Sequence, residues 1–163
     1  GLRTISIGKI NDIFAGKSID ESHPTKGNEE GMEKTMEIAG REFGGLCFTN
    51  LVDFDMLYGH RNDIDGYAAA VTEFDCWLPG FMEQMRSGDI LMITADHGCD
   101  PGYPGTDHTR EYIPFLAYGK DIREGVNLGT RRTFSDIAAT ILDLFGIGQG
   151  TSGESFKDQI LRI

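Results

Sequence analysis

Aspartate and histidine residues gather in three short stretches of this chain. The first runs from Asp53 to His60, the second is Asp96-His97-Gly98, and the third is Asp107-His108-Thr109-Arg110. The chain has only four histidines, and three of them lie in these stretches. A single aspartate after a strand is usually a turn or cap residue. The joint concentration of both residue types instead indicates one shared site.

Five side chains are the candidate metal ligands. A mixed set of carboxylates and imidazoles suits zinc, manganese or iron, whereas calcium prefers oxygen ligands alone. Five ligands are more than one ion needs from a protein, so we predict two divalent ions. Two ions about 4 Å apart can stabilise both the attacking and the leaving oxygen of a phosphoryl transfer. The predicted ligands are Asp55, His60, Asp96, His97 and His108.

Two weaker interpretations remain open at this point. The clusters could be structural and metal-free, which elemental analysis of the purified chain would decide. The chain could also be a non-catalytic metal-binding or interaction domain. His23 has no neighbouring ligand types, since it lies in Ser22-His23-Pro24, and we expect it to be an exposed loop residue.

Apolar runs alternate with amphipathic stretches along the chain. This alternation predicts one α/β domain over residues 1–163, with a mostly parallel sheet and helices on both faces. The apolar patterns predict strands at 2–7, 45–54, 89–95 and 112–118, and helices at 28–42, 66–86 and 135–145. Residues 98–110 are rich in glycine and proline and are expected to form a loop.

Local signals refine these elements. Asn28 and Ser135 are expected helix caps, and Gly146 is expected to end the last helix. Pro79 should kink or split the helix at 66–86, because proline lacks the amide hydrogen that a helix interior needs. In the strand at 45–54, alternation would place Asp53 and Asp55 on one face. Sites in open α/β sheets form at the carboxyl ends of strands, where these clusters begin.

Composition limits the function classes. The chain has 163 residues, 39% of them hydrophobic, and a net charge of -11, so nucleic acid and anionic membranes are unfavourable partners. A phosphate substrate would need local positive charge from lysine, arginine or a bound cation. No stretch is long enough to span a membrane and no signal peptide is visible. The three cysteines are odd in number and show no CxxC spacing, so we expect a reducing, cytoplasmic location.

The third and second stretches together carry a family resemblance. Asp96-His97-Gly98, followed by the segment from Gly105 to Tyr112, resembles the metal-binding signature of the alkaline-phosphatase superfamily. Within that superfamily the longer string is most similar to the phosphopentomutases. The segments 8–14 and 52–61 support the same choice, and the resemblance runs from about Ile7 to Phe145. It implies the α/β core of the alkaline phosphatases.

The resemblance also implies roles for the ligands. Asp55, His60 and His108 would hold one ion, usually manganese in this family, with zinc as the alternative. Asp96 and His97 would hold the second ion, which an aspartate near the family's N-terminus and a threonine nucleophile complete. The reaction implied is the interconversion of ribose or deoxyribose 1-phosphate and 5-phosphate, so the small-molecule partner is a sugar phosphate.

This chain lacks some parts of the family pattern. We find neither the nucleophilic threonine segment nor the cap domain, so we expect the C-terminal part of a metal-binding core with no catalytic nucleophile of its own. Such a chain alone should be inactive, and its expected partner is the N-terminal part of the same enzyme. Lys9 and Arg110 are candidate phosphate contacts. Other superfamily enzymes, such as a cofactor-independent phosphoglycerate mutase or a phosphodiesterase, are the alternatives.

Overall fold

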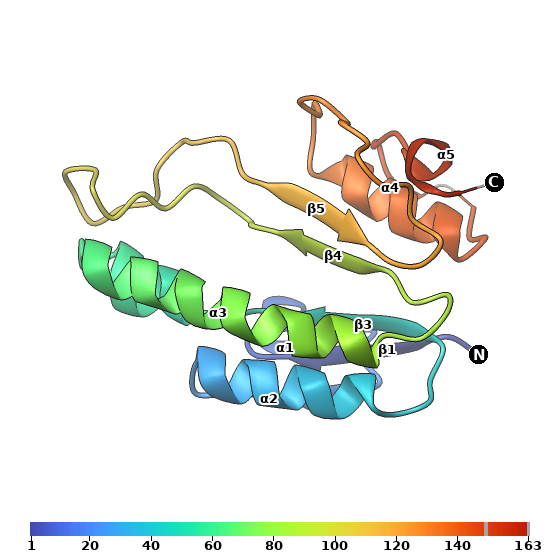
Figure 1. Cartoon of the computed structure of the whole chain (residues 1–163), viewed down its shortest axis with the longest axis horizontal. Coiled ribbons are helices and arrows are strands. Elements are labelled where there is room, and N and C mark those ends of the chain that lie inside the picture. The colour runs from blue at the N-terminus through green and yellow to red at the C-terminus, as the bar shows by residue number, and fades with distance from the viewer. Residues whose placement is uncertain (149, 163) are drawn as a thin grey trace. The chain divides into compact units, whose positions relative to one another are not determined.

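The computed structural model describes residues 1–148 and 150–162 (Figure 1). The chain forms two compact units. The first unit comprises Gly1–Met85 and Thr94–Pro114, and the second comprises Arg86–Ile93 and the chain from Phe115 onward. All five predicted metal ligands belong to the first unit. None of the helices among the described residues is both long enough and apolar enough to cross a membrane.

A three-stranded parallel sheet forms the centre of the first unit. Its order is β2-β1-β3, with β1 at Arg3–Ile7, β2 at Glu21–His23 and β3 at Gly45–Thr49. Ile5 and Ile7 of β1 are fully buried and pack with Ile38 of the helix α2 (Asn28–Ala39). The parallel sheet and its helices confirm the predicted α/β class.

Strand β2 was not predicted, and His23 is not the exposed loop residue that we expected. His23 lies in β2, and its side chain is only 22% exposed. Its Nε2 is 2.7 Å from Oε1 of Glu21, which also pairs with Arg41 at 2.6 Å. The hydrogen bond from Arg41, and then that from His23, lowers the pKa of Glu21 to about 2. Charged pairing, rather than apolar burial, therefore accompanies this edge strand.

Helices lie on both faces of the sheet. Helix α2 packs against β1 and β3 on one face. On the other face, Ile10 of the short helix α1 (Ile10–Ile13) and the turn after it line an apolar recess of about 230 Å³ with Phe48 of β3. Phe48 stays 43% exposed, so this second face is only partly covered.

Helix α3 (Ile64–Gln84) runs without a break through Pro79, so the expectation that the proline would split the helix in two is wrong. Rings on either side of the proline stay in contact, since the Trp77 and Phe81 centroids are 5.0 Å apart. Trp77 also contacts Phe74, with centroids 5.5 Å apart. Contacts with α2 further hold the helix. These packing interactions offset the hydrogen bond that a proline omits.

Two corrections concern the segment that leads to the first cluster. Gly27, not Asn28, is the N-cap of α2. The backbone N–H of Asn28 donates to Oδ2 of Asp53 at 2.6 Å, and the N–H of Asp53 donates to Oδ1 of Asn28 at 2.9 Å. Strand β3 also ends at Thr49 rather than at residue 54. The reciprocal pair instead fixes Asp53 to the start of α2.

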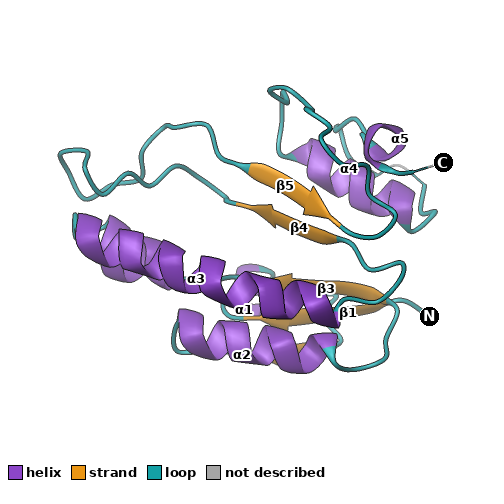
Figure 2. Ribbon diagram, in the orientation of Figure 1, coloured by secondary structure: helices purple, strands orange, loops and turns teal. Residues whose placement is uncertain are grey.

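The second unit contains β5 (Phe115–Tyr118) and all but the last residue of β4 (Leu91–Thr94), and these two strands run antiparallel (Figures 1 and 2). Helices α4 (Ser135–Leu144) and α5 (Lys157–Ile160) follow, and the N-cap of α4 is Phe134 rather than Ser135. The core of this unit is made by Ile122, Phe156 and Ile160 with partly buried neighbours.

A buried carboxylate organises the second unit. Asp136, only 4% exposed, lies in the first turn of α4. Its Oδ1 accepts the N–H of Glu154 at 2.9 Å, and its Oδ2 accepts Nε of Arg131 at 2.8 Å. The hydrogen bond from the Glu154 backbone, together with the Arg131 guanidinium, lowers the pKa of this carboxyl. Asp136 thus joins three segments of the chain.

Candidate metal centre

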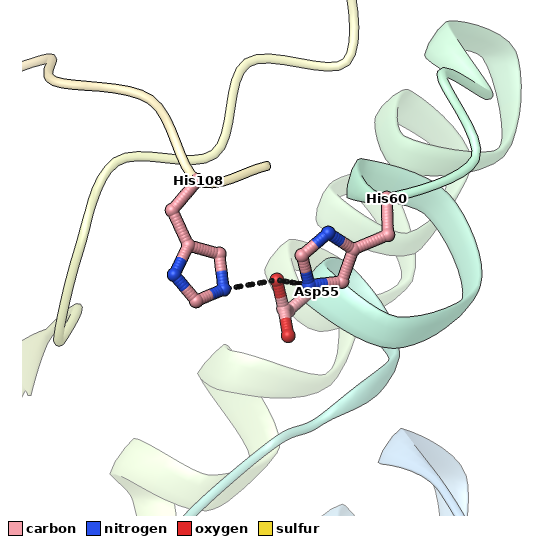
Figure 3. A group of neighbouring side chains, drawn as sticks. All are labelled: Asp55, His60 and His108. Carbon is pink, nitrogen blue, oxygen red and sulfur yellow. Dashed lines mark ion pairs between the residues drawn. The ribbon is translucent and has the colours of Figure 1, made fainter. Parts of the chain in front are cut away.

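Three predicted ligands meet at one point in the first unit (Figure 3). Oδ1 of Asp55 lies 3.1 Å from Nε2 of His60 and 3.3 Å from Nε2 of His108. One ligand atom from each residue lies within 4.8 Å of the other two. His60 and Asp55 come from one turn, whereas His108 comes from the long connection between β4 and β5 (Figure 2).

A π-helix, η1 (Phe54–Gly59), brings Asp55 and His60 together. The N–H of His60 donates to the carbonyl of Asp55 at 3.0 Å, a bond that spans five residues. Such wide turns occur often at functional sites. Gly59 is buried within this turn, and a Cβ there would lie 2.1 Å from Sγ of Cys99. A glycine is therefore required for the turn to pack against the second cluster.

The hydrogen bonds of His60 show that the site fits a cation. Nδ1 of His60 bonds the carbonyl of Thr106, which can only accept a hydrogen bond, so Nδ1 carries a hydrogen. In a neutral ring, Nε2 then presents its lone pair to the carboxylate of Asp55. Two acceptors that face each other at 3.1 Å repel unless a positive charge lies between them. A divalent ion or a proton supplies that charge.

The second cluster adjoins the first. The ring of His97 stacks on that of His108, with centroids 3.5 Å apart. Nδ1 of His97 bonds the carbonyl of Gly98 at 3.0 Å, which leaves Nε2 free as a ligand. Nε2 of His97 is 3.6 Å from Oδ1 of Asp96, whose side chain is 77% exposed. The structure thus brings His97 against the triad but leaves Asp96 turned largely to solvent.

The sequence from residue 3 to residue 149 matches the model of the metalloenzyme superfamily. The chain belongs to the metalloenzyme superfamily. A family named for bound metal agrees with a triad whose donor atoms converge on one point.

Within the metalloenzyme superfamily, the chain is similar to several curated proteins. It is 55% identical, over 99% of its length, to a phosphopentomutase of Lachnoclostridium phytofermentans. It is 54% identical, over 98% of its length, to phosphopentomutases of Carboxydothermus hydrogenoformans and of Symbiobacterium thermophilum. These matches cover 42%, 41% and 41% of the respective relatives. The chain therefore spans about two fifths of the length of the relatives that it matches.

The contact between Cys99 and Asp55 of the triad was not predicted from the sequence. Sγ of Cys99 lies 3.6 Å from Oδ1 of Asp55, at the long limit for a sulfur hydrogen bond. Burial, and then the interaction with Asp55, raises the pKa of this thiol to about 11. Cys99 is therefore a protonated donor to the ligand carboxylate. Its position directly after Asp96-His97-Gly98 was the only signal in the sequence.

The two predicted cationic residues approach the ligands in different ways, Lys9 in space and Arg110 along the chain. Nζ of Lys9 contacts the sulfur of Met56, the residue after Asp55, so this ammonium lies beside the turn that carries the triad. Arg110 is exposed and follows His108 by two positions. Both residues belong to the first unit.

Proposed function

We propose that this chain forms the metal-binding part of a phosphopentomutase, which interconverts ribose or deoxyribose 1-phosphate and 5-phosphate. The observation that carries the proposal is the convergence of Asp55, His60 and His108 in a chain 55% identical to a phosphopentomutase. The relatives are much longer than this chain, so the nucleophile and the rest of the substrate site would come from the sequence that this chain does not include.

We propose manganese as the ion, with zinc as the alternative. The triad would hold the first ion. Asp96 and His97 would hold a second ion, which needs ligands from the remainder of the longer protein. Both His60 and His97 use Nδ1 for a backbone carbonyl, so Nε2 of each ring is available to metal. Orientation of a ligand imidazole through its other nitrogen is a general feature of protein metal sites.

When bound, the two divalent ions would neutralise phosphate charge and stabilise the transferring phosphoryl group. The residues of this chain would position the ions, and the positive charge of the ions would offset the repulsion between the ligand atoms. Cys99 donates to Asp55, so it reduces the freedom of that carboxylate. Lys9 would provide positive charge for the substrate phosphate beside η1, and Arg110 would do so from the His108 loop. These cations matter because the chain as a whole is strongly acidic.

Two other functions are alternatives to a phosphopentomutase. A cofactor-independent phosphoglycerate mutase or a phosphodiesterase would use a similar metal centre, but the relatives named above are all phosphopentomutases. A non-catalytic metal-binding fragment would retain the ions without turnover. We also propose a cytoplasmic location, which the three free cysteines of the chain support.

A chimera tests the proposed function. The 163 residues would replace the matching segment of the Lachnoclostridium relative, and a coupled assay would follow ribose 1-phosphate conversion with manganese. We expect turnover by the chimera, loss of turnover in its Asp55→Asn variant, and none from the chain alone. A folded, metal-loaded chimera that fails to convert ribose 1-phosphate would refute the proposal. Turnover by the chain alone would show that it carries its own nucleophile.

A further inference from the structure

Within the long connection between β4 and β5, the loop that carries His97 and the loop that carries His108 are joined at Thr109. Thr109 and Gly98 form an antiparallel bridge, in which the N–H of Thr109 donates to the carbonyl of Gly98 at 3.0 Å. That same carbonyl accepts Nδ1 of His97 at 3.0 Å. A single backbone oxygen therefore joins the ring of His97 to the residue that follows His108.

The hydroxyl of Thr109 adds two further connections. It accepts the N–H of Asp100 at 2.8 Å, and it donates to Oε2 of Glu111. A hydroxyl can serve both roles at once, since it has one hydrogen and two lone pairs. Asp100 follows Gly98 on the loop that carries His97, and Glu111 follows Thr109 on the loop that carries His108. The hydroxyl thus joins the two loops independently of the backbone bridge.

Gly98 shows how closely the two loops approach. A Cβ on Gly98 would lie 2.6 Å from Oε2 of Glu111 and 2.8 Å from the carbonyl oxygen of Thr109. The contact is possible only because Gly98 has no side chain. His108 itself is exposed, and it reaches Asp55 from a loop that is rich in turns. Its position is therefore set by the residues next to it rather than by burial.

We propose that the Thr109 hydroxyl is a positioning element of the metal centre, which holds His108 at the distance from Asp55 that a shared ion requires. The inference rests on the proposed metal centre. It assigns to Thr109 neither a metal bond nor a nucleophilic role. Residues that orient ligands typically change metal affinity by about 10–100-fold when they are replaced.

Calorimetric titration of the 163-residue chain with manganese tests this role. We expect Thr109→Val, which keeps the shape and removes the hydroxyl, to raise the Kd of the tight site at least about tenfold. Thr109→Ser should stay within about threefold of the unmodified chain, because it restores the hydroxyl. Thr72→Val is the matched control, since it removes a hydroxyl that donates to the carbonyl of Ala68 within α3. This control should leave the Kd unchanged.

The thermal midpoint of each metal-free variant separates positioning from general stability. A variant with an unchanged midpoint and a raised Kd supports the proposal. A folded Thr109→Val variant with the original Kd overturns it. If Thr109→Val does not fold, Glu111→Ala is the second variant. It removes the carboxylate that accepts the Thr109 hydroxyl and keeps the bond from the Asp100 N–H. An unchanged Kd in Glu111→Ala also overturns the proposal. An unmodified chain that binds no manganese would refute the metal centre itself.

Discussion

Replacement of His108 should weaken the tight metal site, whereas replacement of His97 should not. The triad offers three ligands from this chain, whereas Asp96 and His97 offer only two. Structural zinc sites with four ligands bind with about 10–16 kcal/mol, or about 3 kcal/mol for each ligand. His108→Ala would therefore weaken the tight site by about 3 kcal/mol, which is about a hundredfold in Kd. His97→Ala should leave that tight site within a few-fold of the original.

Calorimetric titration of chelator-treated protein with manganese measures both effects. The unmodified chain should bind one ion tightly and a second weakly or not at all. His23→Ala is the control, since it removes an imidazole that lies in β2 and outside the triad. Two sites of equal affinity would contradict the ligand-count argument. A tight site that survives replacement of both His60 and His108 would refute the assignment of the triad.

Acid should also release the ion. Imidazole binds metal only in its neutral form, so protons compete with manganese for His60 and His108. We expect manganese occupancy to fall as the pH is lowered from neutral to acid. Titrations repeated over that range would show a rising Kd. An affinity independent of pH would mean that carboxylates alone hold the ion.

Two stability predictions concern charged side chains away from the centre. Asp136→Ala should destabilise the second unit by about 2–3 kcal/mol, because it leaves Arg131 and the N–H of Glu154 without their buried partner; thermal denaturation should show a decrease of about 5–10 °C. The pKa of Glu21 is lowered from 4.5 to about 2 in the folded chain. Its contribution is therefore complete above about pH 4.5 and is lost as the pH falls toward 2. Glu21→Gln should reduce the loss of unfolding free energy between about pH 4.5 and pH 2, as measured by urea titrations at each pH. An unchanged pH dependence would refute the role of the Glu21–Arg41 pair.

Sequence patterns predicted the elements that bury apolar faces. Strand β1, helix α2 and helix α4 lie within a few residues of the predicted bounds, because their apolar spacing matches the side that packs. Strand β5 begins directly after Pro114, which cannot donate to a ladder, so the prediction from residue 112 was too long. Strand β2 escaped prediction because Glu21-Ser22-His23 has no apolar alternation, and its ion pairs depend on Arg41, which is distant in sequence.

The candidate site shows a similar division. The residue types and their positions after apolar runs indicated five candidate ligands, and the structure brings three of them close enough together to share one ion. The turn that joins Asp55 to His60 could not be predicted as a π-helix, because Val52 to Phe54 alternates as a strand does. Its course depends on Asp53 binding the start of α2, which is a contact between distant segments. The bond from Cys99 to Asp55 depends on the same tertiary approach.

Asp55 lies in η1 and His108 lies in the connection between β4 and β5, so an ion bound to both would act as a reversible cross-link between these two segments. The two residues are 53 positions apart in the sequence (108 minus 55). In the chain-entropy relation used for disulfides, closure of a loop of that length removes about 4 kcal/mol of conformational freedom from the unfolded chain. The relation applies only while the ion remains bound, so chelation would restore that freedom without any change in covalent structure. Divalent metal availability would then set how long the loop at residues 98–110 resists a protease.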